Sequence, residues 1–255
     1  MLPILNRLET DCDWALLHQE TLYRLDARGR ILPEPDEPRA PFPRFHFIRT
    51  RHGNLWRLHR SLDSSSCRAL ARLAGREAPL KLESLTACPP PERLEAMLDV
   101  FRVGDREACW RRGPLYRFPM ESLDRAVLVP EGSNLTVMRS GETGSIEDLS
   151  SLLDPQDVSV DWNWPVVVSR VDGQTVSACF GEPSACDAGV QARVYTRSGH
   201  RRRGLARGCA IAWARAVGEM GGLPLASAEW ENRAACGLAR ELGLEIYADS
   251  LVFMS

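Results

Sequence analysis

Seven apolar residues between positions 205 and 220 constrain the fold of this chain more than any other feature. They recur at spacings of four, three, one, three, one and three residues, which places them on one face of an α-helix of roughly four to five turns. The residues are Leu205, Cys209, Ala212, Trp213, Ala216, Val217 and Met220. Gly221-Gly222 ends the helix, and its apolar face must be buried against another layer of structure.

The residues that lead into this helix form a turn of arginines and small side chains. An extended apolar run ends at Val194-Tyr195-Thr196, and Arg201-Arg202-Arg203-Gly204-Leu205-Ala206 follows. The first N–H groups of a helix have no partner within it, and with the helix dipole they suit a phosphate or pyrophosphate. Gly204 and Ala206 would let an anion approach the backbone closely. Taken alone, these residues fit a helix that begins with solvated arginines better than they fit an anion site.

Strand signals surround this unit on both sides. We expect a strand at 166–168, the strongest type of two-residue hairpin turn at Asp172-Gly173, a returning strand at 176–180 and an extended run over 188–197. After the helix we expect a strand at 223–228 and a helix that starts near Asn232 and ends at Gly243. Two short strands, 244–246 and 251–253, complete this half.

The first half of the chain has a different pattern. Apolar spacing indicates a helix near Trp14, a hairpin over 45–59 and two further helices, one capped by Asp63 and ended by Gly75, the other starting near Pro91. His46, His52 and His59 are expected at the surface or half packed. We place a boundary near 103–113, which predicts an N-terminal α/β domain over 1–110 and a second domain over 111–255.

Composition indicates an ordinary soluble globular protein. The chain has 255 residues, of which 26% are charged, and a formal net charge of -2. No overall field therefore favours nucleic acid or an anionic membrane. Lys81 is the only lysine, and we interpret the excess of arginine as the codon bias of a GC-rich, bacterial genome.

Targeting signals and paired cysteines are lacking. Residues 1–5 are too short for a signal peptide, and no apolar stretch reaches the roughly 18 residues that a membrane helix needs. The eight cysteines include no Cys-x-x-Cys pair and no accompanying histidine cluster, which argues against a metal site. These observations predict a reduced, cytoplasmic protein.

The order of elements over 120–255 resembles the GNAT superfamily of acyl-CoA-dependent N-acyltransferases. The end of the extended run at Val194-Tyr195-Thr196, the arginine turn at 201–206, and Glu231-Asn232 with Leu242-Gly243-Leu244 carry the resemblance. It implies a mixed, mostly antiparallel twisted sheet flanked by helices. The first 110 residues would then be a degenerate copy of the same fold or a cap over the substrate.

The resemblance also implies how acetyl-CoA would be held. The fourth and fifth strands of such folds separate, so backbone groups of Val194, Tyr195 and Thr196 would bind the pantetheine arm like an added strand. The pyrophosphate would lie on the turn formed by Arg201, Arg202, Arg203, Gly204, Leu205 and Ala206. Asn232 would contact the pantetheine arm, or would simply cap the helix that follows.

Catalytic side chains are harder to assign. The position at which the family often has a glutamate base corresponds to Gln191, so Asp187 and Glu229 are the candidate bases. The position of the family's tyrosine acid corresponds to Ala239, which leaves Tyr247 as the nearest candidate acid, with Ser227 a weaker one. Each of these residues is also compatible with an ordinary surface or packing role.

Two functions follow from this sequence. The first is an acetyl-CoA-dependent N-acetyltransferase that acts on a small-molecule amine or a peptide, as a monomer or homodimer. The alternative is a GNAT-like module that binds acyl-CoA without turnover, as a sensor or structural partner. A nucleic-acid-binding role is disfavoured, because the chain has no net positive charge and no aromatics interleaved with its basic residues.

Overall fold

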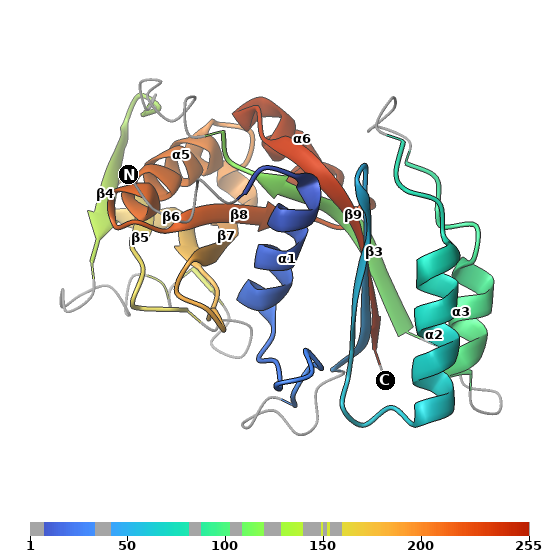
Figure 1. The fold of residues 1–255 in the computed structure, drawn as a ribbon. Coiled ribbons are helices and arrows are strands. Elements are labelled where there is room, and N and C mark those ends of the chain that lie inside the picture. Colours follow the sequence, from blue (N-terminus) through green and yellow to red (C-terminus); the bar gives the residue numbers. More distant parts are fainter. Residues whose placement is uncertain are drawn as a thin grey trace. The chain divides into compact units, whose positions relative to one another are not determined.

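The computed structural model describes residues 8–33, 42–81, 88–102, 109–119, 129–139, 149, 152–153 and 160–254. Figure 1 shows the elements within these ranges. The helices are α1 (Asp11–Leu22), α2 (Ser64–Arg76), α3 (Leu94–Phe101), α5 (Leu205–Glu219) and α6 (Arg233–Leu242). The strands are β1 (Pro43–Thr50), β2 (Gly53–Leu58), β3 (Cys109–Arg117), β4 (Ser133–Met138), β5 (Val166–Val171), β6 (Gln174–Gly181), β7 (Gly189–Thr196), β8 (Leu223–Ser227) and β9 (Glu245–Met254).

The chain divides into two compact units. The first unit comprises Tyr116–Ser227 and Arg233–Glu245, and the second comprises Leu2–Leu115, Ala228–Asn232 and Ile246–Ser255. Both contain helices packed on mostly antiparallel strands, so the expected fold class is confirmed. The boundary predicted near residue 110 stays a prediction, since this division follows spatial proximity and returns twice to the second unit after residue 227.

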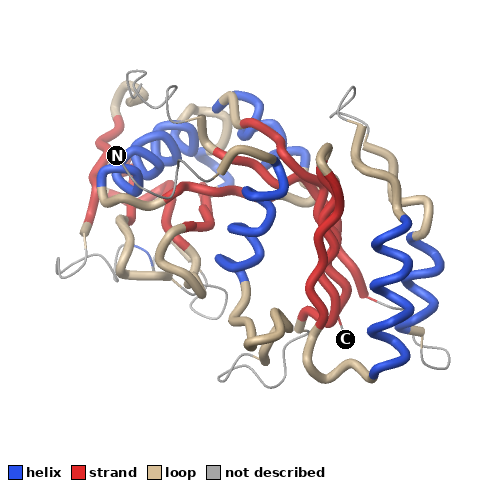
Figure 2. The backbone as a smooth tube through the Cα atoms, in the orientation of Figure 1, coloured by secondary structure: helices blue, strands red, loops and turns tan. Residues whose placement is uncertain are grey.

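The first unit is built around the apolar stripe of α5. Its strands lie in the order β8-β7-β6-β5-β4, and α5 runs along the strands in Figures 1 and 2. Cys209, Trp213 and Val217 of α5 pack with Val167 of β5 and Val190 of β7 in one buried cluster. The spacing of the stripe is therefore what attaches the helix to the sheet.

The hairpin between β5 and β6 forms as its sequence predicts. Asp172 and Gly173 have φ values of 51° and 77°, the left-handed conformation that a two-residue type I′ turn requires at both positions. The strands pair antiparallel on either side of the turn, with Val171 opposite Gln174. The expected hairpin is confirmed.

The second unit is a four-stranded arrangement with helices on both faces. Its strands lie in the order β2-β1-β9-β3, and Figure 1 shows α2 and α3 on one face and α1 on the other. Phe45 and Phe47 of β1, with Leu251 and Phe253 of β9, pack in the same buried cluster as residues of α2 and α3, among them Leu70. The expected 45–59 hairpin is present as β1 and β2.

Side-chain caps fix the beginnings of two helices. The carboxylate of Asp63 accepts hydrogen bonds from the backbone N–H groups of Ser65 at 2.8 Å and Ser66 at 3.0 Å, which confirms the predicted start of α2. The pKa of Asp63 lies below its ordinary value, chiefly because the carboxylate accepts hydrogen bonds from the hydroxyls of Ser65 and Ser66. In α1, Thr10 and Asp13 form a reciprocal capping box.

Three strands differ from the sequence expectations, and one of them, β4, forms where no element is expected. The end of the chain forms one continuous strand, β9 (Glu245–Met254), and not two short ones. The interrupting residues Asp249 and Ser250 are buried within it, because both have side-chain partners in the second unit. Residues 109–117, expected to contain a boundary, form strand β3, in which Gly113 lies against Ala228 so closely that a Cβ atom would come within 1.6 Å of its carbonyl oxygen.

Two histidines expected near the surface are buried. His46 and His59 are 0% and 3% exposed, whereas the side chain of His52 is 49% exposed. His46 Nε2 lies 2.8 Å from Ser250 Oγ, and the ring of Tyr23 packs edge-on against the imidazole. His18 of α1 is also buried and hydrogen-bonds the hydroxyl of Tyr247. These polar contacts join α1 to β1 and β9.

Burial of these histidines predicts a pH-dependent stability. Burial lowers the pKa of His18 and of His46 to about 3 from an ordinary value of 6.5. Below about pH 6.5 the unfolded chain therefore binds protons that the folded chain does not, so the free energy of unfolding falls as pH falls toward 3. We expect each histidine to contribute a slope of at most roughly 1.4 kcal/mol per pH unit.

Urea unfolding of the native chain and of His46→Gln between about pH 7 and 5.5 measures this slope. The variant should be less sensitive to pH over that interval, whatever its absolute stability. Equal slopes for the two proteins would contradict the assignment of His46 as a buried neutral histidine.

Candidate functional site

Strands β7 and β8 pair over only part of their length. They run parallel with Gly189 opposite Leu223, Val190 opposite Pro224 and Gln191 opposite Leu225, and the pairing stops there. Strand β7 continues to Thr196 and stays paired with β6, where Thr196 lies opposite Ser177. The two strands thus separate beyond Gln191, as the sequence analysis expects.

The separation leaves one edge of β7 open. The Glu182 N–H donates to the Gln191 carbonyl and the Arg197 N–H donates to the Val176 carbonyl, both at 2.9 Å, so the odd-numbered residues of β7 direct their backbone groups toward β6. The even-numbered residues face the opposite edge because strand residues alternate. Among the described strands, none therefore pairs with the N–H and C=O of Val194 or with the N–H of Thr196.

The arginine turn reaches α5 through two residues in the left-handed conformation. Arg202 has a φ of 60°, and Gly204, the N-cap, has φ 80° and ψ -3°. The first backbone bond of the helix runs from the Gly208 N–H to the Gly204 carbonyl at 3.0 Å, and Gly204 has no side chain to cap the helix. The N–H groups of residues 205–207 thus lie at an uncapped helix N-terminus.

Two of the three arginines make side-chain contacts at this turn. Arg201 Nε donates to the Thr196 carbonyl at 3.2 Å, and Arg203 Nη1 lies 3.1 Å from His200 Nδ1. All three arginines are exposed, and the 3₁₀ turn Ser198–His200 precedes them. The first side-chain bond links the end of β7 to the start of α5. It therefore holds the open strand edge and the uncapped helix N-terminus in a defined relation.

The candidate catalytic residues are divided between the two units. Asp187 is exposed and lies in the bend two residues before β7, in the first unit. Glu229 belongs to the second unit, is half exposed, and pairs with Arg111 at 3.5 Å. Tyr247, also in the second unit, is 1% exposed and hydrogen-bonds His18 through its hydroxyl. Their proposed roles stay predictions.

The family resemblance also assigns roles to the positions of Asn232 and Ala239. Asn232 is exposed, directly precedes α6, and donates its N–H to the Glu229 carbonyl at 2.9 Å. Ala239 is buried on α6 at 5% exposure. The pantetheine contact assigned to Asn232 stays a prediction, and Ala239 carries no group that transfers a proton.

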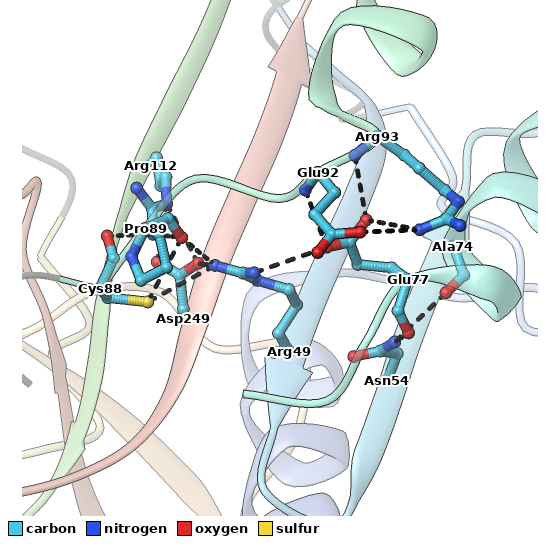
Figure 3. A network of polar contacts seen from close by, with 10 residues as sticks. All are labelled: Arg49, Asn54, Ala74, Glu77, Cys88, Pro89, Glu92, Arg93, Arg112 and Asp249. Carbon is cyan, nitrogen blue, oxygen red and sulfur yellow. Dashed lines mark hydrogen bonds and ion pairs between the residues drawn. The ribbon is translucent and has the colours of Figure 1, made fainter. Parts of the chain in front are cut away.

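Sequence reasoning missed a buried polar network in the second unit, drawn in Figure 3. Asp249 of β9 is fully buried and accepts hydrogen bonds from Arg49 Nη2 at 2.7 Å, Arg112 Nε at 3.0 Å and Trp230 Nε1 at 2.9 Å. Glu77 lies 3.7 Å from Arg49 and accepts N–H bonds from Glu92 and Arg93. No local motif marks these residues, because their partners are distant in the sequence.

Metal-binding clusters and membrane-spanning helices are absent from the described ranges. No group of three or more His, Cys, Asp or Glu side chains there is placed to hold a metal ion. Over the same residues, every helix falls short of the length and apolar character required to cross a bilayer.

Comparison with known proteins supports the fold. No protein-family model matches the sequence, and no curated protein matches it. The structure of a GCN5-related N-acetyltransferase-like protein from Streptococcus suis is similar, with a TM-score of 0.51 and 18% identity over 84% of each chain. A GCN5-related N-acetyltransferase from Kribbella flavida gives a TM-score of 0.46 and 20% identity over 64% of each chain.

The network around Asp249 predicts a large stability effect. Replacing Asp249 with Asn leaves the buried guanidinium groups without their common anion, so we expect the free energy of unfolding to fall by about 3–5 kcal/mol. Asp99→Asn is the matched control, because Asp99 pairs with Arg102 at the surface and should change stability little. Denaturant unfolding measures both, and similar small changes in the two variants would contradict the prediction.

Proposed function

Because the chain has the fold of the GCN5-related N-acetyltransferases, we propose that it transfers an acetyl group from acetyl-CoA to the amine of a small molecule or peptide. One observation carries the proposal: the open edge of β7 leads, through the arginine turn, to the uncapped N-terminus of α5. A strand edge binds an extended amide chain, and a helix N-terminus binds a phosphate. Coenzyme A contains both groups in covalent sequence.

The residues of the first unit fit this ligand. The backbone groups of Val194 and Thr196 would pair with the amides of the pantetheine arm, and the N–H groups from Arg202 to Ala206 would hold the pyrophosphate. Gly204 has no Cβ, and the nearest atom to a Cβ built there is Pro130 Cγ at 3.6 Å. When bound, acetyl-CoA supplies an acetyl thioester, which is the electrophile of the reaction.

The chain must then assist three changes at the reacting carbonyl. An amine loses a proton, negative charge develops on the carbonyl oxygen, and the thiolate departs. The unpaired N–H at the open edge of β7 is suited to the developing charge. We assign removal of the proton to Asp187, which belongs to the same unit as this edge; the roles of Glu229 and Tyr247 stay predictions.

A second candidate function rests on Gln191 and Ala239. Neither side chain transfers protons, although the family resemblance expects a base and an acid at these positions. A chain that binds acyl-CoA without turnover would have no need of either group. The two functions share the cofactor site and differ only in whether thiol is released when an amine is present.

The cofactor site is tested by Gly204→Glu. A carboxylate on the turn would repel the pyrophosphate, so acetyl-CoA should raise the melting temperature of the native chain and not of this variant. Gly204→Gln carries the same bulk and backbone strain without the charge and should keep part of the shift. Gly243→Glu places the same change at another glycine of positive φ, 69°, and should keep all of it.

The shift is followed by thermal unfolding with and without acetyl-CoA. An equal shift in Gly204→Glu and in the native chain would contradict the placement of the pyrophosphate on this turn. A native chain that acetyl-CoA does not stabilise would contradict the proposed function itself.

The candidate bases are tested by Asp187→Asn and Glu229→Gln. Because Asp187 lies in the same unit as the open edge of β7, we expect Asp187→Asn to slow thiol release by about a hundredfold or more, the usual contribution of a general base. Glu229→Gln should retain activity. Release of free thiol with a panel of amines measures both, and silence of the native chain across the panel would favour the non-catalytic alternative.

A further inference from the structure

Gln191 occupies the point at which β7 and β8 part. It lies opposite Leu225, the last paired position between the two strands, and is 4% exposed. Its neighbours Val190 and Ala192 pack in the cluster that contains α5. Since successive strand residues alternate between faces, the Gln191 side chain lies on the face away from α5.

Within the described part of the chain, one end of the Gln191 amide has a partner and the other end has none. Its Nε2 donates to Ser227 Oγ at 2.9 Å, which bridges β7 and β8. Its Oε1 is buried and accepts no hydrogen bond within the described part of the chain. A buried amide oxygen normally accepts at least one hydrogen bond. The apex of the strand separation therefore presents an acceptor with no donor from the described residues.

We propose that Gln191 Oε1 accepts a hydrogen bond from the N–H of the acceptor amine and positions it for transfer. The inference rests on the proposed N-acyltransferase function and names its substrate class. The acceptor is a weakly basic amine, such as an arylamine or a hydrazide, which is already neutral near neutral pH. Gln191 is a specificity-determining residue in this scheme.

The choice of amine follows from the charge of the amide. A carboxylate at this position would stabilise an ammonium group and take its proton, whereas a carboxamide does neither. Glu182, next to Gln191 across the strand pair, has its carboxylate paired with Arg193 Nη2 at 2.5 Å. An alkylamine of lysine-like pKa is neutral in only about one molecule in a thousand at pH 7.4. A weakly basic amine is already neutral at this pH, so its reactive form is not scarce.

The transfer step needs only the neutral amine and the acetyl thioester as reactants. The lone pair of the neutral amine forms the C–N bond at the thioester carbonyl, and the C–S bond breaks. The electron pair of that bond leaves on sulfur as the coenzyme A thiolate. One amine proton remains hydrogen-bonded to Gln191 Oε1 until the product leaves, and the other passes to Asp187, the candidate base.

The experiment compares aniline with benzylamine, which differ in basicity but are similar in size. Thiol release with acetyl-CoA should give the native chain a higher kcat/KM for aniline near pH 7, and its activity with benzylamine should rise with pH. In Gln191→Glu the carboxylate should favour the ammonium form of benzylamine. The ratio of kcat/KM for aniline to kcat/KM for benzylamine should therefore fall by about tenfold or more, which corresponds to the free energy of one charge-assisted hydrogen bond.

Gln191→Leu and Ser227→Ala separate positioning from a structural role. The leucine has no acceptor, so the KM for aniline should rise about tenfold while the KM for acetyl-CoA stays unchanged. Ser227→Ala removes the bridge between the strands but keeps Oε1, and should preserve the preference for aniline. Equal effects of the two variants would show a structural bridge only and would overturn the proposal.

The remaining outcomes distinguish this inference from the proposed function. An aniline-to-benzylamine ratio that is the same in the native chain and Gln191→Glu overturns the role of Gln191 and leaves the acyltransferase function standing. Silence of the native chain with both amines, with stabilisation by acetyl-CoA intact, overturns the amine site and favours the non-catalytic module. A native chain that acetyl-CoA does not stabilise removes the proposed function, and the inference with it.

Discussion

The short parallel ladder between β7 and β8 is the constraint on which the candidate site depends. It joins the strands from Gly189 to Gln191 and then ends, while β6 holds the other edge of β7 to Thr196. The strand is thus rigid on one side and open on the other. The core that packs α5 against β5 and β7 fixes the helix on the same sheet. A longer ladder would close the edge and leave α5 with an uncapped N-terminus and no adjoining strand edge.

The second unit depends on a different interaction, the buried Asp249 carboxylate with its three donors. Arg49 comes from β1, Arg112 from β3 and Trp230 from the 228–232 segment. Removing charges from water is costly, and good geometry with several hydrogen bonds offsets that cost. Such a network tolerates few alternative arrangements of its strands. We infer that it contributes to the specificity of the fold as well as to its stability.

The sequence predicts those elements whose signals are local. The α5 stripe, the Asp172-Gly173 turn and the Asp63 cap each depend on residues that are close in sequence. The turn, the cap and the stripe from Leu205 to Val217 are present as expected. Met220, the last residue of the predicted stripe, follows the helix and is 48% exposed. The sequence predicts two short strands in place of β9, because Asp249 and Ser250 interrupt the apolar pattern. Their partners, Arg49 and His46, lie about two hundred positions earlier, so no local pattern indicates that polar side chains are satisfied inside a strand.

The same distinction separates the two halves of the candidate site. Backbone N–H groups at a helix N-terminus can bind a phosphate when small residues lead into the helix, so a short stretch of sequence is enough to propose the cofactor contacts. A base or an acid acts only where tertiary structure brings it to the reacting atom. Asp187 and Glu229 come from different compact units, and their sequence positions carry no information on how far either carboxylate lies from the reacting atom. Gln191 differs from both, because the unpartnered amide oxygen becomes visible only once the strand ladder and the Ser227 contact are known. A residue that the family resemblance marks only as a missing base is, in three dimensions, a neutral acceptor at the apex of the open strands.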